Sequence, residues 1–199
     1  MISKENIFSS PHFQVWLFSG EIGSRSSPIR KLITDKLLAE YLEVDSSQIC
    51  RETGLYGKPR VLTLQSPHRS VEFSISHTQK FLTISISPFF SVGVDIVEQD
   101  RNFDFLSVVE HFFSEREKKW LAKFPSGQQN QEFHRIWCRK EAVIKSVGLG
   151  AQLSYHQLDV LEDTSTIQDL PLSGSQPRLV EITDLSPHFD CQMSVATML

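Results

Sequence analysis

Asp95 is a carboxylate inside an otherwise apolar segment, residues 91–97. Such a group is costly to bury unless it is paired, hydrogen-bonded or bound to a cation, which makes it a candidate functional residue. Alternation along a strand equally allows Asp95 to face solvent, so the residue type leaves both interpretations open. Glu98, just beyond the segment, is typical of a solvated charge at the end of a strand.

Glu141 and Lys145 are an acid and a cation four residues apart, which places them on one face of a helix. Phe133, Ile136 and Trp137 recur at helical spacing nearby, so the simplest interpretation is a core helix with an exposed ion pair worth ~0.3–0.5 kcal/mol. The same acid and cation would also suit Mg²⁺ and a phosphate. Mg²⁺ takes one or two carboxylates and completes its octahedron with water and phosphate oxygens.

Two shorter segments carry groups suited to a phosphate. His77 follows an alternating segment and is flanked by the hydroxyls of Ser76 and Thr78. A lone histidine at a strand end is more often structural, but hydroxyls and an imidazole can together donate hydrogen bonds to an anion. Gly57-Lys58-Pro59 is a stiff turn that presents a lysine and means little in isolation.

Hydrophobic periodicity predicts the elements that must position these residues. We expect strands at 13–18, 60–64, 71–76, 81–87, 91–97, 157–161, 178–183 and 189–196, with a loop at 163–176. We expect helices at 29–42, 103–111, 114–123 and 129–147. Ser114 followed by Glu117 is a capping-box pattern. Strands and a long helix in each half indicate an α+β fold of two packed subdomains, although no sequence repeat is visible.

Composition restricts the class of protein. The 199 residues are 40% hydrophobic and 22% charged, as in one globular domain or two small ones. A net charge of −4 gives no indication of a nucleic-acid partner. Three widely spaced cysteines disfavour a disulfide framework or a zinc cluster and favour a reducing compartment. The polar N-terminus and the lack of a long apolar run predict a cytoplasmic protein without a membrane partner.

Four motifs, taken in order, resemble those of the 4′-phosphopantetheinyl transferases of the surfactin-synthetase-activating type. They are Gly57-Lys58-Pro59, Ser76-His77, Gly93-Val94-Asp95 and Trp137-Cys-Arg-Lys140-Glu141-Ala-Val-Ile-Lys145. The segment Phe113-Ser114-Glu115-Arg116-Glu117 also resembles a helix start of that family. Each motif is weak alone, whereas four in order are specific. The matching stretch runs from residue 29 to residue 150.

The resemblance implies a fold and a reaction. The fold would be a pseudo-twofold pair of similar α/β subdomains, residues 1–80 and 81–199, with coenzyme A in the cleft between them. The reaction, that of a holo-[acyl-carrier-protein] synthase, would move the 4′-phosphopantetheine arm of coenzyme A to a serine hydroxyl of an apo acyl or peptidyl carrier protein. Adenosine 3′,5′-bisphosphate would be released. Two similar halves would already supply a paired surface, so we expect a monomer.

The resemblance also implies roles for individual residues. Asp95 and Glu141 would hold Mg²⁺ on the diphosphate of coenzyme A, whose charge must be neutralised for phosphoryl transfer. The implied catalytic residues are Glu141, Lys145 and His77, and Glu141 would also take the serine proton. The implied coenzyme-binding residues are Lys58, Ser76, His77, Asp95, Glu141, Lys145 and Arg51.

Two departures from the family pattern motivate an alternative function. Val97 replaces a second acid that many members carry, and Glu98 would lie on the opposite face of a regular strand. The segment 19–28 is shorter than the helical stretch whose basic residues grip the 3′-phosphate of coenzyme A in the family. Candidate replacements are Arg25, Arg30, Lys31 and Arg51. The alternative is a non-catalytic protein of the same fold that binds coenzyme A or a carrier protein.

The carrier protein is expected to be a small acidic helical domain, so docking would need a basic surface. Candidate basic residues are His134, Arg135, Arg139 and Lys140 on one predicted helix and Arg116, Lys118 and Lys119 on another. An ordinary solvated helix face explains the same charges equally well. The pathway of the carrier (fatty acid, polyketide or nonribosomal peptide) stays open.

Overall fold

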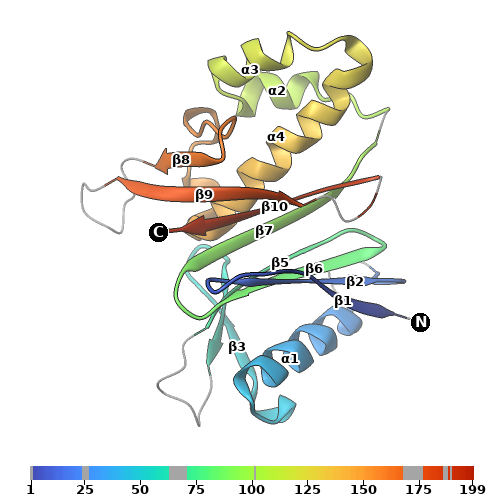
Figure 1. The fold of residues 1–199 in the computed structure, drawn as a ribbon, viewed down its shortest axis with the longest axis vertical. Helices are drawn as coiled ribbons and strands as arrows, with labels where there is room; N and C mark the ends of the chain where they lie inside the picture. Colours follow the sequence, from blue (N-terminus) through green and yellow to red (C-terminus); the bar gives the residue numbers. More distant parts are fainter. Residues whose placement is uncertain are drawn as a thin grey trace.

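The computed structural model describes residues 2–23, 27–62, 71–100, 102–167, 177–185, 188 and 190–199. These residues form an α+β structure in which two four-stranded antiparallel sheets lie between helices (Figure 1). None of the described helices combines the length and apolar composition needed to cross a bilayer.

Each sheet is paired with one long helix. The first sheet contains, in spatial order, β1 (Ser3–Ser9), β2 (Gln14–Ser19), β6 (Phe81–Ser87) and β5 (Glu72–His77). The second contains β7 (Ser91–Glu98), β10 (Cys191–Met198), β9 (Arg178–Leu185) and β8 (Thr164–Ile167). A separate ribbon joins β3 (Cys50–Thr53) and β4 (Pro59–Leu62). The helices are α1 (Pro28–Leu42), α2 (Leu106–Phe112), α3 (Glu115–Leu121) and α4 (Ser126–Val147).

The layers follow from the two-residue period of the strands. In β2, Phe18 packs into a core with α1, whereas Val15 and Leu17 on the other face pack against the second sheet. A third core lies between the second sheet and α4 and includes Ile136 and Val143. The order of layers is therefore α1, first sheet, second sheet, α4, with α2 and α3 beside α4 (Figure 1).

The two halves repeat one connectivity. Strand, helix and two further strands recur in the same order, as β2-α1-β5-β6 and as β7-α4-β9-β10, once the β3–β4 ribbon, α2, α3 and β8 are treated as insertions. In both cases the last strand lies between the other two, in the orders β2-β6-β5 and β7-β10-β9. The repeat that the family resemblance implied is thus present in the topology, although the sequence shows no repeated motif.

The edges of the two sheets meet at β5 and β7. The backbone amide of Val94 in β7 donates to Ser74 Oγ of β5 at 3.1 Å, and Ser76 Oγ donates to Asp95 Oδ1 at 2.6 Å. Edge strands carry backbone groups that lack a strand partner, and here serine side chains of one sheet bond the edge of the other. The polar residues at this junction belong to both halves.

Gly93 allows β7 to lie unusually close to α4. A Cβ at this position would be 2.0 Å from the carbonyl oxygen of Ala142 and 2.3 Å from the amide nitrogen of Ser146. Asp95 is on the same face of β7, two residues further along the strand, so it also faces α4. The glycine of the Gly-x-Asp motif therefore sets the distance between the carboxylate strand and the helix that carries Glu141 and Lys145.

The structure confirms most of the expected elements, adds the strand β3 that was not expected, and corrects three further details. The capping box is present, because Ser114 Oγ accepts from the Glu117 amide and the Glu117 carboxylate accepts from the Ser114 amide. No strand covers 157–161, where a 3₁₀ turn, Tyr155–Gln157, is followed by irregular chain. The polar strand β1 was not expected, and β8 begins inside the predicted loop 163–176.

Strand β6 belongs to the first sheet rather than to the second half of the chain. It pairs with β2 and β5, and Leu82, Ile84 and Ile86 complete the core under α1. The chain changes from one sheet to the other at residues 88–90, after the boundary expected between residues 80 and 81. The reason is that hydrophobic alternation identifies a strand but not the sheet it joins.

Gly93→Ala is expected to lower the free energy of unfolding by about 3 kcal/mol, because the atoms that meet the new methyl group are backbone and yield little. Urea unfolding followed by circular dichroism measures this loss. Gly127→Ala is the matched control in α4, where an added Cβ meets nothing within 4 Å, and should leave stability equal or slightly higher. A Gly93→Ala protein as stable as this control would refute the close-contact argument.

Candidate active site

A cavity of about 1070 Å³ lies between the two halves. Its walls come from α1, the β3–β4 ribbon and β5 on one side, and from α4 and the turn after it on the other. Six of the seven residues predicted to bind coenzyme A line it: Arg51, Lys58, Ser76, His77, Glu141 and Lys145. The seventh, Asp95, does not line the cavity but accepts hydrogen bonds from two residues that do, Ser76 and Lys145. The tertiary structure thus gathers motifs that are distant in sequence around one space.

Asp95 is buried and held by two donors. Only 5% of the residue is exposed, and its Oδ1 accepts from Ser76 Oγ at 2.6 Å and from Lys145 Nζ at 2.5 Å. The pairing compensates the cost of burying a carboxylate, and it excludes the solvent-facing interpretation of this residue. Helix spacing had suggested that Lys145 pairs with Glu141, one turn away in α4. In the structure Lys145 pairs instead with Asp95 of β7.

Glu141 lines the cavity, and the pKa of its carboxyl group is raised. Its Oε1 accepts a hydrogen bond from the hydroxyl of Tyr155 at 2.8 Å. Burial and then the negative charge of Asp95 raise the pKa of Glu141, while the Tyr155 bond and Lys145 oppose the rise. A carboxyl group with a raised pKa is a better proton acceptor than an ordinary one, and two close carboxylates favour a cation between them.

Lys58 joins the ribbon to the second half. Its ammonium contacts Ser91 Oγ at 2.6 Å, the carbonyl oxygen of Ser146 at 3.2 Å and Glu72 Oε2 at 3.0 Å. Burial lowers the pKa of Lys58, and the Glu72 charge opposes that shift. The lysine of the Gly-Lys-Pro turn therefore lines the cavity while its ammonium already bridges three elements.

Basic residues of the first half line the cavity away from Glu141. Arg30 and Lys31 come from the first turns of α1, and Arg51 comes from β3. Arg51 Nε is 2.8 Å from Asp35 Oδ1, which orients its guanidinium. His77, at the end of β5, lines the same space. Arg25, the fourth candidate for the 3′-phosphate, lies outside the described residues.

Asp95 and Glu141 fit a magnesium site of the two-carboxylate kind. Their charges are near enough for Asp95 to raise the pKa of Glu141, and both lie in a partly desolvated place. Such a pair suits an ion that takes one or two carboxylates and completes its octahedron with water and phosphate oxygens. The described part of the chain holds no group of three or more His, Cys, Asp or Glu residues that could bind a metal.

Glu98 points away from this pair. Glu98 is opposite Cys191 in the β7–β10 register. The two side chains are close, since the negative charge of Glu98 adds to the effect of burial in raising the pKa of Cys191 to about 11. Val94 and Ile96, on the same face, pack between the two sheets. Asp95 occupies the other face of β7, as the alternation of a regular strand predicted for these two residues.

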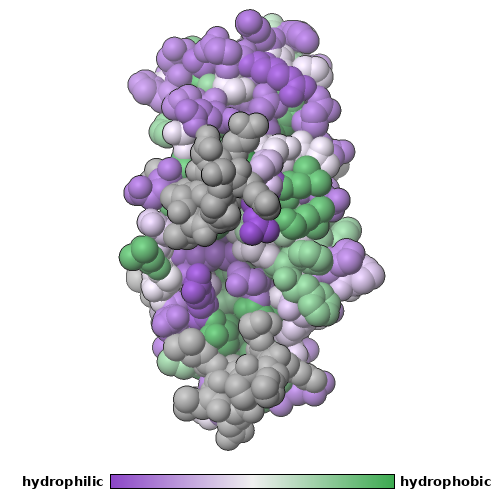
Figure 2. Space-filling model, turned by 90° about the vertical axis from the view of Figure 1, so that its left-hand side faces the viewer, coloured by the Kyte–Doolittle hydropathy of each residue, from purple (hydrophilic) through white to green (hydrophobic). Residues whose placement is uncertain are grey.

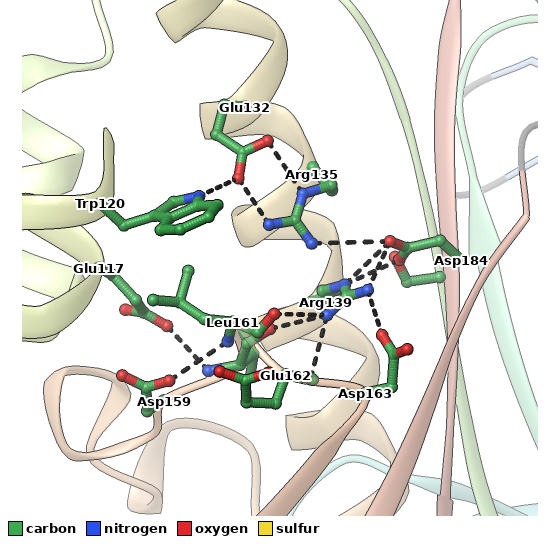
Figure 3. Close-up of polar contacts among 12 residues, drawn as sticks. Glu117, Trp120, Glu132, Arg135, Arg139, Asp159, Leu161, Glu162, Asp163 and Asp184 are labelled. Atoms are coloured by element: carbon green, nitrogen blue, oxygen red, sulfur yellow. Dashed lines mark hydrogen bonds and ion pairs between the residues drawn. The ribbon is translucent and has the colours of Figure 1, made fainter. Parts of the chain in front are cut away.

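The basic residues of α4 that the sequence suggested for carrier docking are largely buried. Arg139 and His134 are each 5% exposed and Lys140 is fully buried. Figure 3 shows the Arg139 guanidinium pointing from α4 toward Asp184 and Asp163, to which it is bonded at 2.8–3.0 Å. It also donates to the carbonyl oxygens of Val160, Leu161 and Glu162.

Lys140 forms a second internal network. Its ammonium is 2.8 Å from Glu117 Oε2, both side chains are fully buried, and it donates to the carbonyl oxygens of Tyr155 and Leu158. Glu117 Oε1 accepts from the amide of Val160. Neither docking nor a solvated helix face explains these cations. They attach α4 to α3 and to the chain that follows it.

Tyr155 is the site residue that sequence reasoning missed. It lines the cavity and bonds Glu141, from which it is fourteen residues distant in sequence. A tyrosine in a short turn carries no local signal of such a contact. Only the path of the chain after α4 brings its hydroxyl to the carboxylate.

Comparison with known proteins agrees with the motifs. The family model described as the 4′-phosphopantetheinyl transferase superfamily matches residues 91–191. The 4′-phosphopantetheinyl transferase psf-1 of Bacillus pumilus is 30% identical over 178 residues, which are 88% of this chain and 72% of that protein. The transferase Sfp of Bacillus subtilis (strain 168) is 27% identical, over 83% of this chain and 71% of that protein.

Two other comparisons are more limited. The 4′-phosphopantetheinyl transferase gsp of Aneurinibacillus migulanus is 32% identical over 62% of this chain, which spans 48% of that longer protein. A solved holo-(acyl-carrier-protein) synthase of Bacillus anthracis str. Ames, in complex with CoA (3′,5′-ADP), aligns with a TM-score of 0.39 at 19% identity. That alignment covers 55% of this chain and 96% of the solved one, and a score of this size carries no argument.

The family model covers half of the chain, and the Bacillus pumilus relative covers most of it. The four motifs, the family model and the relatives agree, and the chain belongs to the 4′-phosphopantetheinyl transferase superfamily.

Proposed function

We propose that this chain transfers the 4′-phosphopantetheine arm of coenzyme A to a serine hydroxyl of an apo carrier protein, in the presence of Mg²⁺. The serine oxygen forms a bond to the β-phosphorus, the bond to the bridging oxygen breaks, and adenosine 3′,5′-bisphosphate leaves. One observation carries the proposal: a single cavity joins Ser76 and His77 of the first half to Glu141 and Lys145 of the second.

Asp95 and Glu141 are the residues that would hold Mg²⁺. When bound there, the ion supplies positive charge to the oxygens of the diphosphate, whose negative charge otherwise repels a nucleophile. Ser76 and Lys145 fix the Asp95 carboxylate beforehand, each by a short hydrogen bond to Oδ1. This preorganisation lowers the cost of arranging charges during the reaction.

Glu141 would accept the serine proton, and Lys145 would donate a hydrogen bond to a phosphate oxygen. The raised pKa of Glu141 suits it to accept the serine proton, directly or through a water molecule. Lys145 lines the cavity with its ammonium 2.5 Å from Asp95, a position from which it can also donate to a phosphate oxygen. His77 would add a contact to the same phosphates.

The basic residues of α1 and β3 would hold the 3′-phosphate of coenzyme A. Arg30, Lys31 and Arg51 line the first-half wall of the cavity, and Thr34 and Thr53 line it beside them. Guanidinium, ammonium and hydroxyl groups together are the donors that phosphate monoesters bind. They come from elements other than the short segment 19–28, so the shortening of that segment does not remove cations from the cavity.

Carrier docking is proposed on α3 rather than on α4. A surface hollow of about 710 Å³ is lined by three cations (Arg116, Lys119 and Lys123), by Trp120 and by two acids (Glu115 and Glu162), so its lining has a small positive excess. The end of the molecule formed by α2, α3 and the start of α4 is mainly hydrophilic on the face shown in Figure 2 (top). An acidic domain is attracted to such cations even when the net charge of the protein is −4. Because the cavity is completed by two halves of one chain, we propose that a monomer is sufficient.

Incubation with coenzyme A, Mg²⁺ and an apo acyl carrier protein is expected to add one phosphopantetheine group, seen by intact-mass spectrometry. Glu141→Ala and EDTA should each reduce the rate at least about a hundredfold, the usual size of losing a charge-stabilising group. Glu40→Gln is the control, because Glu40 is an exposed carboxylate of α1 that pairs with Lys4 and does not line the cavity. Carrier or coenzyme binding without any mass increase would favour the non-catalytic alternative.

Lys31→Ala is expected to raise the KM for coenzyme A about tenfold, as for the loss of one charge-assisted hydrogen bond. The KM for dephospho-coenzyme A, which lacks the 3′-phosphate, should stay unchanged. Lys36→Ala is the matched control, because Lys36 is an exposed lysine of the same helix. An equal effect on both coenzymes would place the 3′-phosphate elsewhere.

Glu141→Gln is expected to raise the free energy of unfolding at pH 7 by about 1 kcal/mol, the typical gain when a strained functional residue is replaced. The pKa of Glu141 is raised by burial and by Asp95, so the folded state binds its proton more tightly than the unfolded state does. The stabilisation that this carboxyl contributes is complete below its unfolded pKa and is lost as pH rises through the folded pKa. Urea unfolding in metal-free buffer should show the gain of the variant shrinking as pH falls from 7 toward about pH 4, with no further change below that pH; a variant less stable at pH 7 would contradict the argument.

A further inference from the structure

Tyr155 contacts both the helices that support the candidate active site and a carboxylate within that site. It begins a 3₁₀ turn, Tyr155–Gln157, in the connection from α4 to β8. Its hydroxyl donates to Glu141 Oε1 at 2.8 Å, and the side chain lines the cavity. None of the four sequence motifs includes it.

The ring of Tyr155 is held by aromatic contacts. It stacks on Trp137 of α4 with ring centroids 5.7 Å apart and an angle of 18° between the planes. It meets Phe112 of α2 edge to face, with centroids 5.2 Å apart and an angle of 71°. Offset stacking and edge-to-face contacts are the favourable arrangements of aromatic pairs, so the ring has one well-defined position.

The backbone of Tyr155 is held by the buried ion pair. Its carbonyl oxygen accepts from Lys140 Nζ at 2.7 Å, and Lys140 is paired with Glu117 at 2.8 Å in a fully buried environment. Lys140 and Glu141 are neighbours in α4. One residue of the helix thus anchors the turn, and the next receives the hydroxyl that the turn presents.

The hydroxyl prevents a competing contact within α4. Glu141 and Lys145 are spaced so that they can pair on the surface of a helix, as the sequence suggested. In the structure Glu141 bonds Tyr155 instead, and Lys145 is left to pair with Asp95. Packing of the ring against Trp137 and Phe112 needs no hydroxyl, so the hydroxyl contributes only through the bond to the carboxylate.

We infer that Tyr155 is a positioning residue for the proposed transfer, because its hydroxyl holds the Glu141 carboxylate in the cavity and away from Lys145. The inference rests on the proposed function. The bond occupies Oε1, which leaves Oε2 for a cation or for the serine proton. Without the hydroxyl, Glu141 gains rotamers that include the pairing with Lys145, and Asp95 then shares Lys145 with Glu141 while keeping its bond to Ser76.

The test is Tyr155→Phe, which keeps the ring and removes the hydroxyl. We expect kcat to fall about tenfold or more and the KM for coenzyme A to stay the same, since loss of a group that orients a metal ligand usually costs this much. Mn²⁺ affinity in the presence of coenzyme A, measured by electron paramagnetic resonance, should weaken about tenfold. Tyr41→Phe, a half-buried tyrosine of α1 that does not line the cavity, is the control and should match the wild type.

A double-mutant cycle with Glu141→Gln separates positioning from a merely structural role. If Tyr155 acts through Glu141, the double variant binds Mn²⁺ as weakly as Glu141→Gln alone, whereas a general loss of structure would add a further defect. A Tyr155→Phe protein with wild-type kcat and Mn²⁺ affinity would overturn the inference and leave the proposed function standing. A wild-type protein without transfer activity would refute the proposed function. The Tyr155–Glu141 coupling is measured separately, as the non-additivity of the two substitutions in urea unfolding. Additive effects of the two substitutions on the free energy of unfolding would overturn that coupling.

Discussion

The contact between β7 and α4 at Gly93 is the constraint on which the candidate site depends. The hydrogen side chain of glycine lets the strand approach to where a Cβ would be 2.0 Å from a helix carbonyl oxygen. At this spacing Asp95, on the same face of the strand, reaches Lys145 at 2.5 Å and is close enough to Glu141 to raise the pKa of that carboxyl. A wider gap would separate Asp95 on β7 from Glu141 and Lys145 on α4. The Gly-x-Asp motif is therefore a packing requirement and a chemical requirement together.

Helix α4 presents different charges to different surroundings because successive residues point about 100° apart. The buried guanidinium of Arg139 pairs with Asp184 of β9, and the fully buried Lys140 pairs with Glu117 of α3. Glu141, the next residue, turns toward the cavity. Removing either partner of a buried pair leaves an uncompensated charge, so these networks hold the helix in a single orientation. The buried pairs of Arg139 and Lys140 therefore also fix the direction in which Glu141 points.

The cavity lies where the two topological repeats meet, which explains its mixture of residues. Each repeat contributes an edge strand to this junction, β5 of one sheet and β7 of the other, and edges leave polar backbone groups to be bonded. Ser74 meets that need for the backbone amide of Val94, and Ser76 bonds the Asp95 carboxylate beside it. Polar groups required to close the fold are thereby available to a polar ligand. Neither half contains the complete set of candidate residues.

The sequence by itself determined the local features of this protein. Two-residue alternation located β6, the Ser114 and Glu117 pair located the start of α3, and four short motifs indicated the family, because periodicity, caps and motifs depend on near neighbours. The tertiary structure alone decided the partners: Lys145 with Asp95 rather than Glu141, Lys140 with Glu117, and Tyr155 with Glu141. It also decided that β6 joins the first sheet. A charged side chain is compatible with solvent or with a buried partner, and the difference depends on contacts between distant segments that hydrophobic burial brings together.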